Sequence, residues 1–170
     1  FRTYPDTQHL LKGLYVMNGY FGDKPLPEPW YNWNSWVDPL ASKIVFASKV
    51  ASHRVIPLEV TQILTIEADR VGELLVEDSE LMKAVFDFGN AWLESSNKLT
   101  LHDPLVAISI FYPNICQFEK GFVDVETNNL ADMGATTFTA NSGGNVAIAR
   151  TVDKVQFYKI LSTTLNDRDY

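Results

Sequence analysis

Short apolar runs and longer segments with helical periodicity alternate along the first half of the chain. Residues 14–17 form an apolar run typical of a buried strand, and residues 54–60 form a second, which Pro57 makes less regular. Apolar side chains recur at helical spacing in residues 39–49 and 79–96, which predicts two helices. Strands and helices therefore alternate here, as they do in α/β proteins.

The second half of the chain predicts a different arrangement. Residues 61–76 are typical of two short helices, and residues 105–111 of a buried helix that follows the pair Asp103-Pro104. A helix begun by Asp153 closes the chain. Three strands are expected between these helices, at 117–126, 134–140 and 146–151, with a Gly143-Gly144 turn joining the last two. This order predicts an α/β fold with an antiparallel strand element late in the chain.

Two of these helices carry apolar side chains on one face. The helix at 79–96 places four of them together, and the last helix is expected to turn four inward. These are Leu81, Val85, Phe88 and Trp92 in the first, and Val155, Tyr158, Leu161 and Leu165 in the second.

Composition narrows the function classes. The chain has 170 residues, 46% of them hydrophobic, which suffices for one domain with a core. Its net charge of −7 argues against the basic surface that nucleic-acid polymers require and against a polybasic membrane anchor. No apolar stretch approaches the ~18 residues of a membrane helix. Cys116, the single cysteine, has apolar neighbours and is expected to be buried. These features favour a cytoplasmic protein.

The loop at residues 30–39 is the first candidate site. Asn32 and Asn34 alternate there with large aromatic residues. Amide side chains donate and accept hydrogen bonds to sugar hydroxyls, and aromatic rings form flat apolar walls for a ring-shaped ligand. A loop of packed aromatics with turn-forming Asn has the same composition, and composition alone favours this structural reading.

The pair His102-Asp103 is the second candidate. A histidine at a strand-to-helix junction is well placed to act as a general acid, and a neighbouring carboxylate can bind a hard cation such as Ca²⁺. Asp-Pro is also a common helix start, as at Asp38-Pro39. The other histidines, His9 and His53, lie among polar residues and are expected at the surface.

Five segments, in this order, resemble the C-terminal half of the inosine–uridine-preferring nucleoside hydrolases. Residues 15–19 resemble the family's strand end V-hydrophobic-M-G-G, and residues 32–45 resemble its segment E-F-N-x-x-x-D-P-E-A-A-x-I-V. Residues 56–61 resemble V-P-L-D-V-T, and residues 101–107 resemble H-D-P-L-A-V-A. Residues 123–126, together with Met133-Gly134, resemble V-D-V-E…G-M-T. The resemblance implies a Rossmann-like fold and hydrolysis of purine or pyrimidine ribonucleosides to ribose and free base, as in nucleoside salvage.

The resemblance also implies roles for individual residues. His102 would protonate the departing base, Asp103 would bind a Ca²⁺ ion that activates water, and Asn34 would hold a ribose hydroxyl. Asn32 would also bind substrate, although the family has Glu at this position. Phe88 and Trp92 would flank the base. Relatives are commonly homodimers or homotetramers, so a homo-oligomer is expected.

One part of the family pattern has no match in this sequence. The N-terminal cluster D-x-D-x-G-x-D-D, which supplies most of the Ca²⁺ carboxylates, is not found here. Residues 1–170 are therefore expected to form the C-terminal portion of one hydrolase domain, with the N-terminal part as a potential partner. The alternative is a nucleoside-hydrolase-like module that is catalytically inactive and has a binding or structural role.

Overall fold

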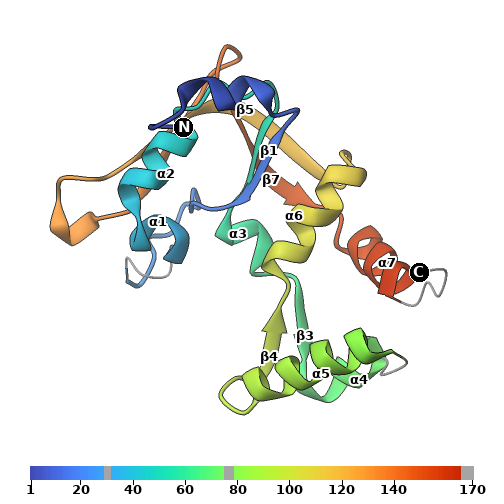
Figure 1. Cartoon of the computed structure of the whole chain (residues 1–170). Helices are drawn as coiled ribbons and strands as arrows, with labels where there is room; N and C mark the ends of the chain where they lie inside the picture. Colours follow the sequence, from blue (N-terminus) through green and yellow to red (C-terminus); the bar gives the residue numbers. More distant parts are fainter. Residues whose placement is uncertain (29–31, 75–78, 166–170) are drawn as a thin grey trace.

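A computed structural model describes residues 1–28, 32–74 and 79–165 (Figure 1). Its main feature is a mixed five-stranded sheet in the order β1-β2-β7-β5-β6, in which β1, β2 and β7 are parallel and β5 runs antiparallel to β7 and β6. The strands are β1 (Leu14–Met17), β2 (His53–Ile56), β5 (Cys116–Val125), β6 (Thr136–Ala140) and β7 (Val146–Val152). The predicted α/β fold with a late antiparallel element is confirmed.

Helices pack on both faces of this sheet or lie in the connections beside it. They are the 3₁₀ helices η1 (Pro5–Leu10) and η4 (Leu130–Asp132), and the α-helices α1 (Trp33–Val37), α2 (Pro39–Phe46), α3 (Leu58–Thr61), α6 (His102–Phe111) and α7 (Lys154–Leu165). Two of them start as the sequence predicts. Asp38 Oδ1 accepts from the Ala41 N–H at 2.9 Å, and Asp153 Oδ1 accepts from the Gln156 N–H at 2.9 Å.

The core has two layers because successive side chains of a strand point to opposite faces of the sheet. On one face, Ile56 of β2 packs with Leu105 of α6 and Phe157 of α7. On the other face, Val55 packs with Phe46 of α2. All five are almost completely buried. Helices α6 and α7 are thus fixed on one side of the sheet and α2 on the other.

A small unit projects from the sheet at the bottom of Figure 1. It consists of β3 (Thr65–Glu67) paired antiparallel with β4 (Lys98–Thr100), the 3₁₀ helix η3 (Ala68–Arg70), α4 (Val71–Leu74) and α5 (Glu80–Leu93). Its own core is formed by Ile66, Val71 and Met82. The prediction of two helices at 61–76 is wrong in part, because the segment forms β3 before the short helix α4; residues 75–76 lie outside the described residues.

Other boundaries also differ from the prediction. Strand β2 ends at Ile56, because Pro57 starts the turn into α3 and cannot donate to a strand ladder. Helix α6 begins at His102 with Leu101 as its N-cap, two residues earlier than a cap at Asp103 would give. Strands β6 and β7 are joined as expected but do not pair, since β5 lies between them.

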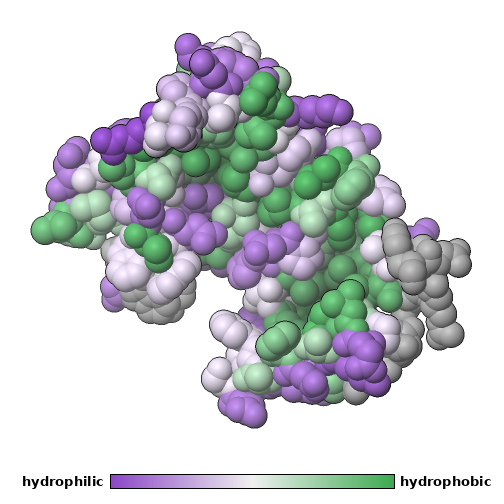
Figure 2. All heavy atoms as spheres, viewed as in Figure 1, coloured by the Kyte–Doolittle hydropathy of each residue, from purple (hydrophilic) through white to green (hydrophobic). Residues whose placement is uncertain are grey.

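The two predicted apolar helix faces differ in how far their side chains are buried. In α7, Val155 is 81% exposed rather than buried, and Phe157 enters the core instead. In α5, Leu81, Phe88 and Trp92 share one face as predicted, but that face is exposed. Figure 2 shows apolar surface on this projecting unit and a hollow between it and the region of α1.

The structure also shows whether Cys116 and two of the histidines have the burial that the sequence predicts. Cys116 is buried as predicted, and burial raises the pKa of its thiol to about 11. His9 is exposed, as predicted. His53 is only 3% exposed, so its predicted surface position is wrong. Within the described ranges, the helices are too short or too polar to cross a lipid bilayer.

Candidate functional site

The carboxyl ends of β1 and β2 lie at one edge of the sheet because the two strands are parallel. Met17, the last residue of β1, is in register with Ile56, the last residue of β2. Helix α3 follows β2 directly, and the Leu58 N–H donates to the Gly19 carbonyl at 2.9 Å, which ties the two strand ends together. In α/β proteins this edge is where ligands bind.

His102 lies at this edge as the first residue of α6. Its Nδ1 is 2.7 Å from Oγ1 of Thr61, the last residue of α3. The buried Thr61 hydroxyl also lies 3.2 Å from the Leu58 carbonyl, to which it donates. Thr61 Oγ1 can therefore accept from Nδ1–H of a protonated ring. Nδ1 is engaged in this contact, which makes Nε2 the ring nitrogen that can serve a ligand.

Two opposing influences act on the His102 ring. Partial burial lowers the pKa of His102, because the charged imidazolium loses hydration. The adjacent Asp103 carboxylate opposes this shift and raises the same pKa. Asp103 itself is exposed in the first turn of α6.

The calcium ion implied by the family resemblance can be tested against the described side chains. In that part of the chain no three His, Cys, Asp or Glu residues gather where they could share a metal ion. Asp103 is a single exposed carboxylate, and Ca²⁺ requires 6–8 oxygen ligands. The described residues therefore do not form a complete calcium site.

Asn34 reaches the same edge from α1. Its side-chain amide donates to the Met17 carbonyl at 2.8 Å and lies 3.5 Å from the Met17 sulfur. The amide nitrogen is thus fixed at the end of β1, and the side chain is otherwise exposed. The structure attaches Asn34 to the end of β1 and His102, through Thr61, to the segment that follows the neighbouring β2.

Asn32 has a different environment. It is 5% exposed, and its amide nitrogen donates to the Gly134 carbonyl at 3.2 Å and approaches Thr136 Oγ1 at 3.4 Å. These contacts hold the start of α1 against the loop before β6. Asn32 also lines a cavity of about 640 Å³ together with Tyr20 and Arg150. Its role toward a substrate stays a prediction.

Phe88 and Trp92 lie on the projecting unit rather than at the sheet edge. Their side chains are 78% and 61% exposed on α5. No described contact joins them to His102 or Asn34. Their predicted place beside a base also stays a prediction.

Sequence reasoning missed two residues that shape this edge. Asn18 Oδ1 accepts from the Ser35 hydroxyl at 2.6 Å, and its amide donates to Ser42 Oγ at 3.2 Å, so Asn18 joins the end of β1 to both α1 and α2. Glu59 of α3 accepts from the Phe21 N–H at 3.1 Å. The signal for Asn18 was its Asn-Gly turn at a strand end, and for Glu59 a lone acid within an apolar run.

Burial raises the pKa of Glu59, and the backbone N–H of Phe21 and the more distant Arg150 charge lower it again. Burial is the largest of these effects, so the net shift is upward. The carboxylate nevertheless holds the loop after β1 against α3. Together Asn18 and Glu59 position the loop and helix that carry Asn34.

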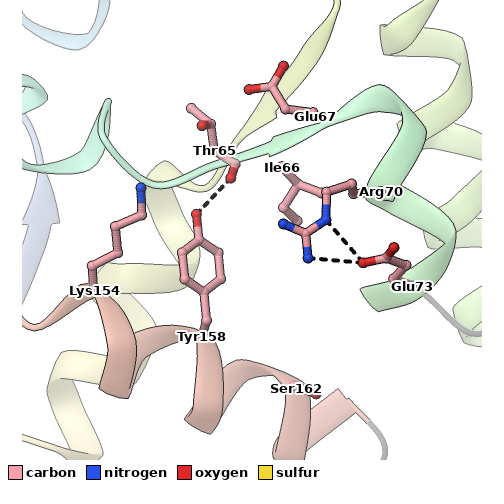
Figure 3. A pocket seen from close by; sticks show the side chains of 8 residues that line it. All are labelled: Thr65, Ile66, Glu67, Arg70, Glu73, Lys154, Tyr158 and Ser162. Carbon is pink, nitrogen blue, oxygen red and sulfur yellow. Dashed lines mark hydrogen bonds and ion pairs between the residues drawn. The ribbon is translucent and has the colours of Figure 1, made fainter.

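Another cavity lies between α7 and the projecting unit (Figure 3). It has a volume of about 430 Å³. The Tyr158 hydroxyl donates to the Thr65 carbonyl across it at 2.7 Å, and the Arg70 guanidinium pairs with Glu73 at 3.0 Å. The sequence-predicted site residues do not line this cavity. The Tyr158–Thr65 bond fastens the projecting unit to α7, whereas the Arg70–Glu73 pair lies within the unit.

Gly134 is the backbone position on which α1 depends. Its φ is +83°, and a Cβ there would meet Ser35 O at 2.7 Å and Trp36 Cα at 2.6 Å. We expect Gly134→Ala to lower the free energy of unfolding by about 2 kcal/mol, since both the positive φ and the collision with α1 are unfavourable. Urea unfolding measures this loss. Gly72→Ala is the matched control, because nothing lies within 4 Å of its Cβ; an equal loss in both variants would contradict the prediction.

Solved structures of known proteins share this fold. A plant nucleoside hydrolase, the PpNRh1 enzyme, is 20% identical with a TM-score of 0.73, over 90% of this chain and 53% of its own. The purine-preferring ribonucleoside hydrolase from Gardnerella vaginalis is 18% identical with a TM-score of 0.78, over 96% and 55%. An inosine-guanosine nucleoside hydrolase is 17% identical with a TM-score of 0.71, over 89% and 51%. At these identities the likeness shows the fold alone.

The sequence comparisons extend this result. The uncharacterized protein C1683.06c of Schizosaccharomyces pombe is 27% identical over 171 residues, which cover 92% of this chain and 54% of that protein. The chain thus spans about half the length of the relatives that it matches. The model of the family described as inosine-uridine preferring nucleoside hydrolase matches residues 1–159. Since this match covers nearly the whole sequence, the chain belongs to the inosine-uridine preferring nucleoside hydrolase family.

Proposed function

We propose that the full-length protein hydrolyses the N-glycosidic bond of purine or pyrimidine ribonucleosides. The observation that carries this proposal is the contact of His102 Nδ1 with Thr61 Oγ1 at 2.7 Å, at the sheet edge that also holds Asn34. Family membership supports the same reaction class. The base preference is left open, because an aromatic side chain stacks on any base.

The geometry of His102 supports the chemistry that we propose for it. Cleavage of a glycosidic bond passes through an oxocarbenium-like transition state in which the leaving group gains negative charge. A protonated His102 ring keeps Nδ1–H on Thr61 and presents Nε2–H to the departing base. Transfer of this proton neutralises the base as the bond to ribose breaks.

Asn34 would orient the sugar in the same reaction. Its amide nitrogen is held by the Met17 carbonyl, so Oδ1 is the atom that can accept from a ribose hydroxyl. Because the Asn34 amide is already fixed, its side chain loses little further conformational entropy when it orients the ribose ring.

Calcium is proposed for the full-length protein only. Asp103 would give one ligand, and the remaining oxygens must come from outside the residues described here. We therefore assign no catalytic activity to residues 1–170 alone.

Removal of calcium from the full-length protein with a chelator should abolish ribose release, and re-addition of Ca²⁺ should restore it.

The experiment that tests the function measures release of reducing sugar from inosine and uridine by the full-length protein with Ca²⁺. Turnover of either nucleoside supports the proposal. The lack of turnover of both, with a folded protein and with calcium present, would refute it.

A second candidate is a module that binds nucleosides without hydrolysing them. The observation that favours it is Asn32, which replaces the Glu of the family motif and whose amide is engaged by Gly134. Calorimetry with inosine separates the two functions, because heat of binding without ribose release would support the second.

Thr61 offers a test of how His102 is oriented. In Thr61→Val the shape is nearly kept but Nδ1 loses its partner, so we expect kcat for inosine to fall about tenfold with little change in KM. Thr61→Ser keeps the hydroxyl and should restore most of the activity. A Thr61→Ser enzyme as slow as Thr61→Val would show that the methyl group matters and the hydrogen bond does not.

A further inference from the structure

Four strands place one row of side chains on the same face of the sheet, closer to the starts of β2 and β7 than the candidate site is. Tyr15 of β1 is in register with Arg54 of β2, Arg54 with Ala147 of β7, and Ala147 with Lys120 of β5. Residues in register point to the same face of a sheet. The small side chain of Ala147 therefore separates two long cationic side chains, whose strands lie about 10 Å apart.

The arrangement encloses a cavity of about 400 Å³. It lies near the start of β2 and β7, whereas the candidate active site lies beyond the carboxyl ends of β1 and β2. The lining includes Arg54, Ala147, Lys120, Phe118 and Asn145, and among the described residues no carboxylate lines it. The two cations of this lining contrast with the net charge of −7 of the whole chain.

Arg54 is held rigidly in this row. Its guanidinium lies over the Phe118 ring at 4.8 Å and over the Tyr15 ring at 5.8 Å. Its hydrogen-bond partner is the Pro113 carbonyl at 3.4 Å, a long contact that uses one of five N–H donors. Stacking fixes the plane of the guanidinium and leaves donors at its edge for a ligand.

Neither cation is neutralised within the described ranges. The ion pairs found there join Lys43 to Asp124, Arg70 to Glu73, Lys83 to Glu80 and Arg150 to Glu119, and none includes Arg54 or Lys120. Glu119 precedes Lys120 in β5, but its carboxylate is bound to Arg150 at 2.7 Å. The positive charge in the cavity is thus uncompensated.

We propose that this cavity binds a phosphate dianion, either free or as a phosphomonoester. Two cations on opposite sides of a gap match a doubly charged tetrahedral oxyanion, whereas a carboxylate would satisfy only one of them. Arg54 donates from the edge of its fixed guanidinium, and Lys120 donates from its flexible stem across Ala147. The site is independent of the function proposed above.

Titration calorimetry at low salt tests this site with the full-length protein. One arm uses inorganic phosphate and the other ribose 5-phosphate, which distinguishes a free anion from an ester. We expect binding of at least one probe. Lys120→Gln should weaken it about tenfold, since one charge-assisted contact is lost.

Two further variants make the test specific. Lys49→Gln removes the same charge from an exposed lysine outside the cavity lining and should leave affinity unchanged. Ala147→Val keeps every charge but fills the gap, and should abolish binding. Thermal unfolding checks that Ala147→Val is folded; if it is not, the two lysine variants decide. The proposal is overturned if neither probe binds, if both lysine variants weaken binding equally, or if folded Ala147→Val binds like the wild type.

Discussion

His102→Ala in the full-length protein is expected to lower kcat for inosine by about 10²–10⁴-fold, the usual contribution of a positioned general acid. The loss should fall on kcat rather than on KM, because the proton is needed only as the glycosidic bond breaks. The residue occupies the start of α6, is half-buried, and its Nδ1 is held by Thr61. Steady-state kinetics with inosine or uridine measures the effect.

A second substrate shows whether proton transfer is the step that is lost. When a nitrophenyl riboside is cleaved, nitrophenolate leaves as a stable anion and needs no protonation, so His102→Ala should keep most of its activity toward this substrate. His9→Ala is the control, since His9 is an exposed histidine of η1. If His102→Ala lost both activities to the same degree, His102 would be acting through folding or binding and not as an acid.

The strands of the main sheet and the helices beside them could be predicted from local sequence, because their ends carry strong local signals. The apolar run at β1 ends in Asn-Gly, and Asp38 is followed by Pro39 at the start of α2. The pairing of β3 with β4 had no such signal. Each of these strands has three residues, too few for a periodicity, and their partners are about thirty residues apart.

The sequence indicated candidate site residues but not their contacts. The order of motifs singled out His102 and Asn34 as candidates, and the structure brings both to neighbouring strand ends. The partner of His102 is Thr61, 41 positions earlier, and the partner of Asn32 is Gly134, 102 positions later. Such contacts depend on how strands are ordered in the sheet, which no local pattern specifies.

The burial of His53 in the core is likewise not specified by its local sequence. Polar neighbours in the sequence predicted a surface residue, yet β2 carries the ring into the layer between the sheet and α2. There it stacks on Phe46, with ring centroids 6.2 Å apart and planes at 19°. In the described structure, neither ring nitrogen has a hydrogen-bond partner. Burial without a partner penalises the charged ring and lowers the pKa of His53 from 6.5 to about 4.

This lowered pKa predicts a loss of stability in acid. Between pH 6.5 and about 4 the unfolded chain binds a proton at His53 and the folded chain does not. The unfolded state then holds more protons, so the free energy of unfolding falls as the pH falls through this window, by up to about 3 kcal/mol. Urea unfolding at several pH values from 7.5 to 4.5 measures the slope.

Comparison with His53→Phe isolates this contribution from that of the carboxylates. Phenylalanine keeps a ring against Phe46 and cannot take up a proton, so the variant should lose stability less steeply than the wild type below pH 6.5. His9→Gln removes an exposed histidine instead and should follow the wild-type curve. Parallel curves for His53→Phe and the wild type would mean that the His53 ring gains a partner or water in solution. The pair of variants therefore tests directly whether an imidazole without a hydrogen-bond partner is held neutral in the core beneath α2.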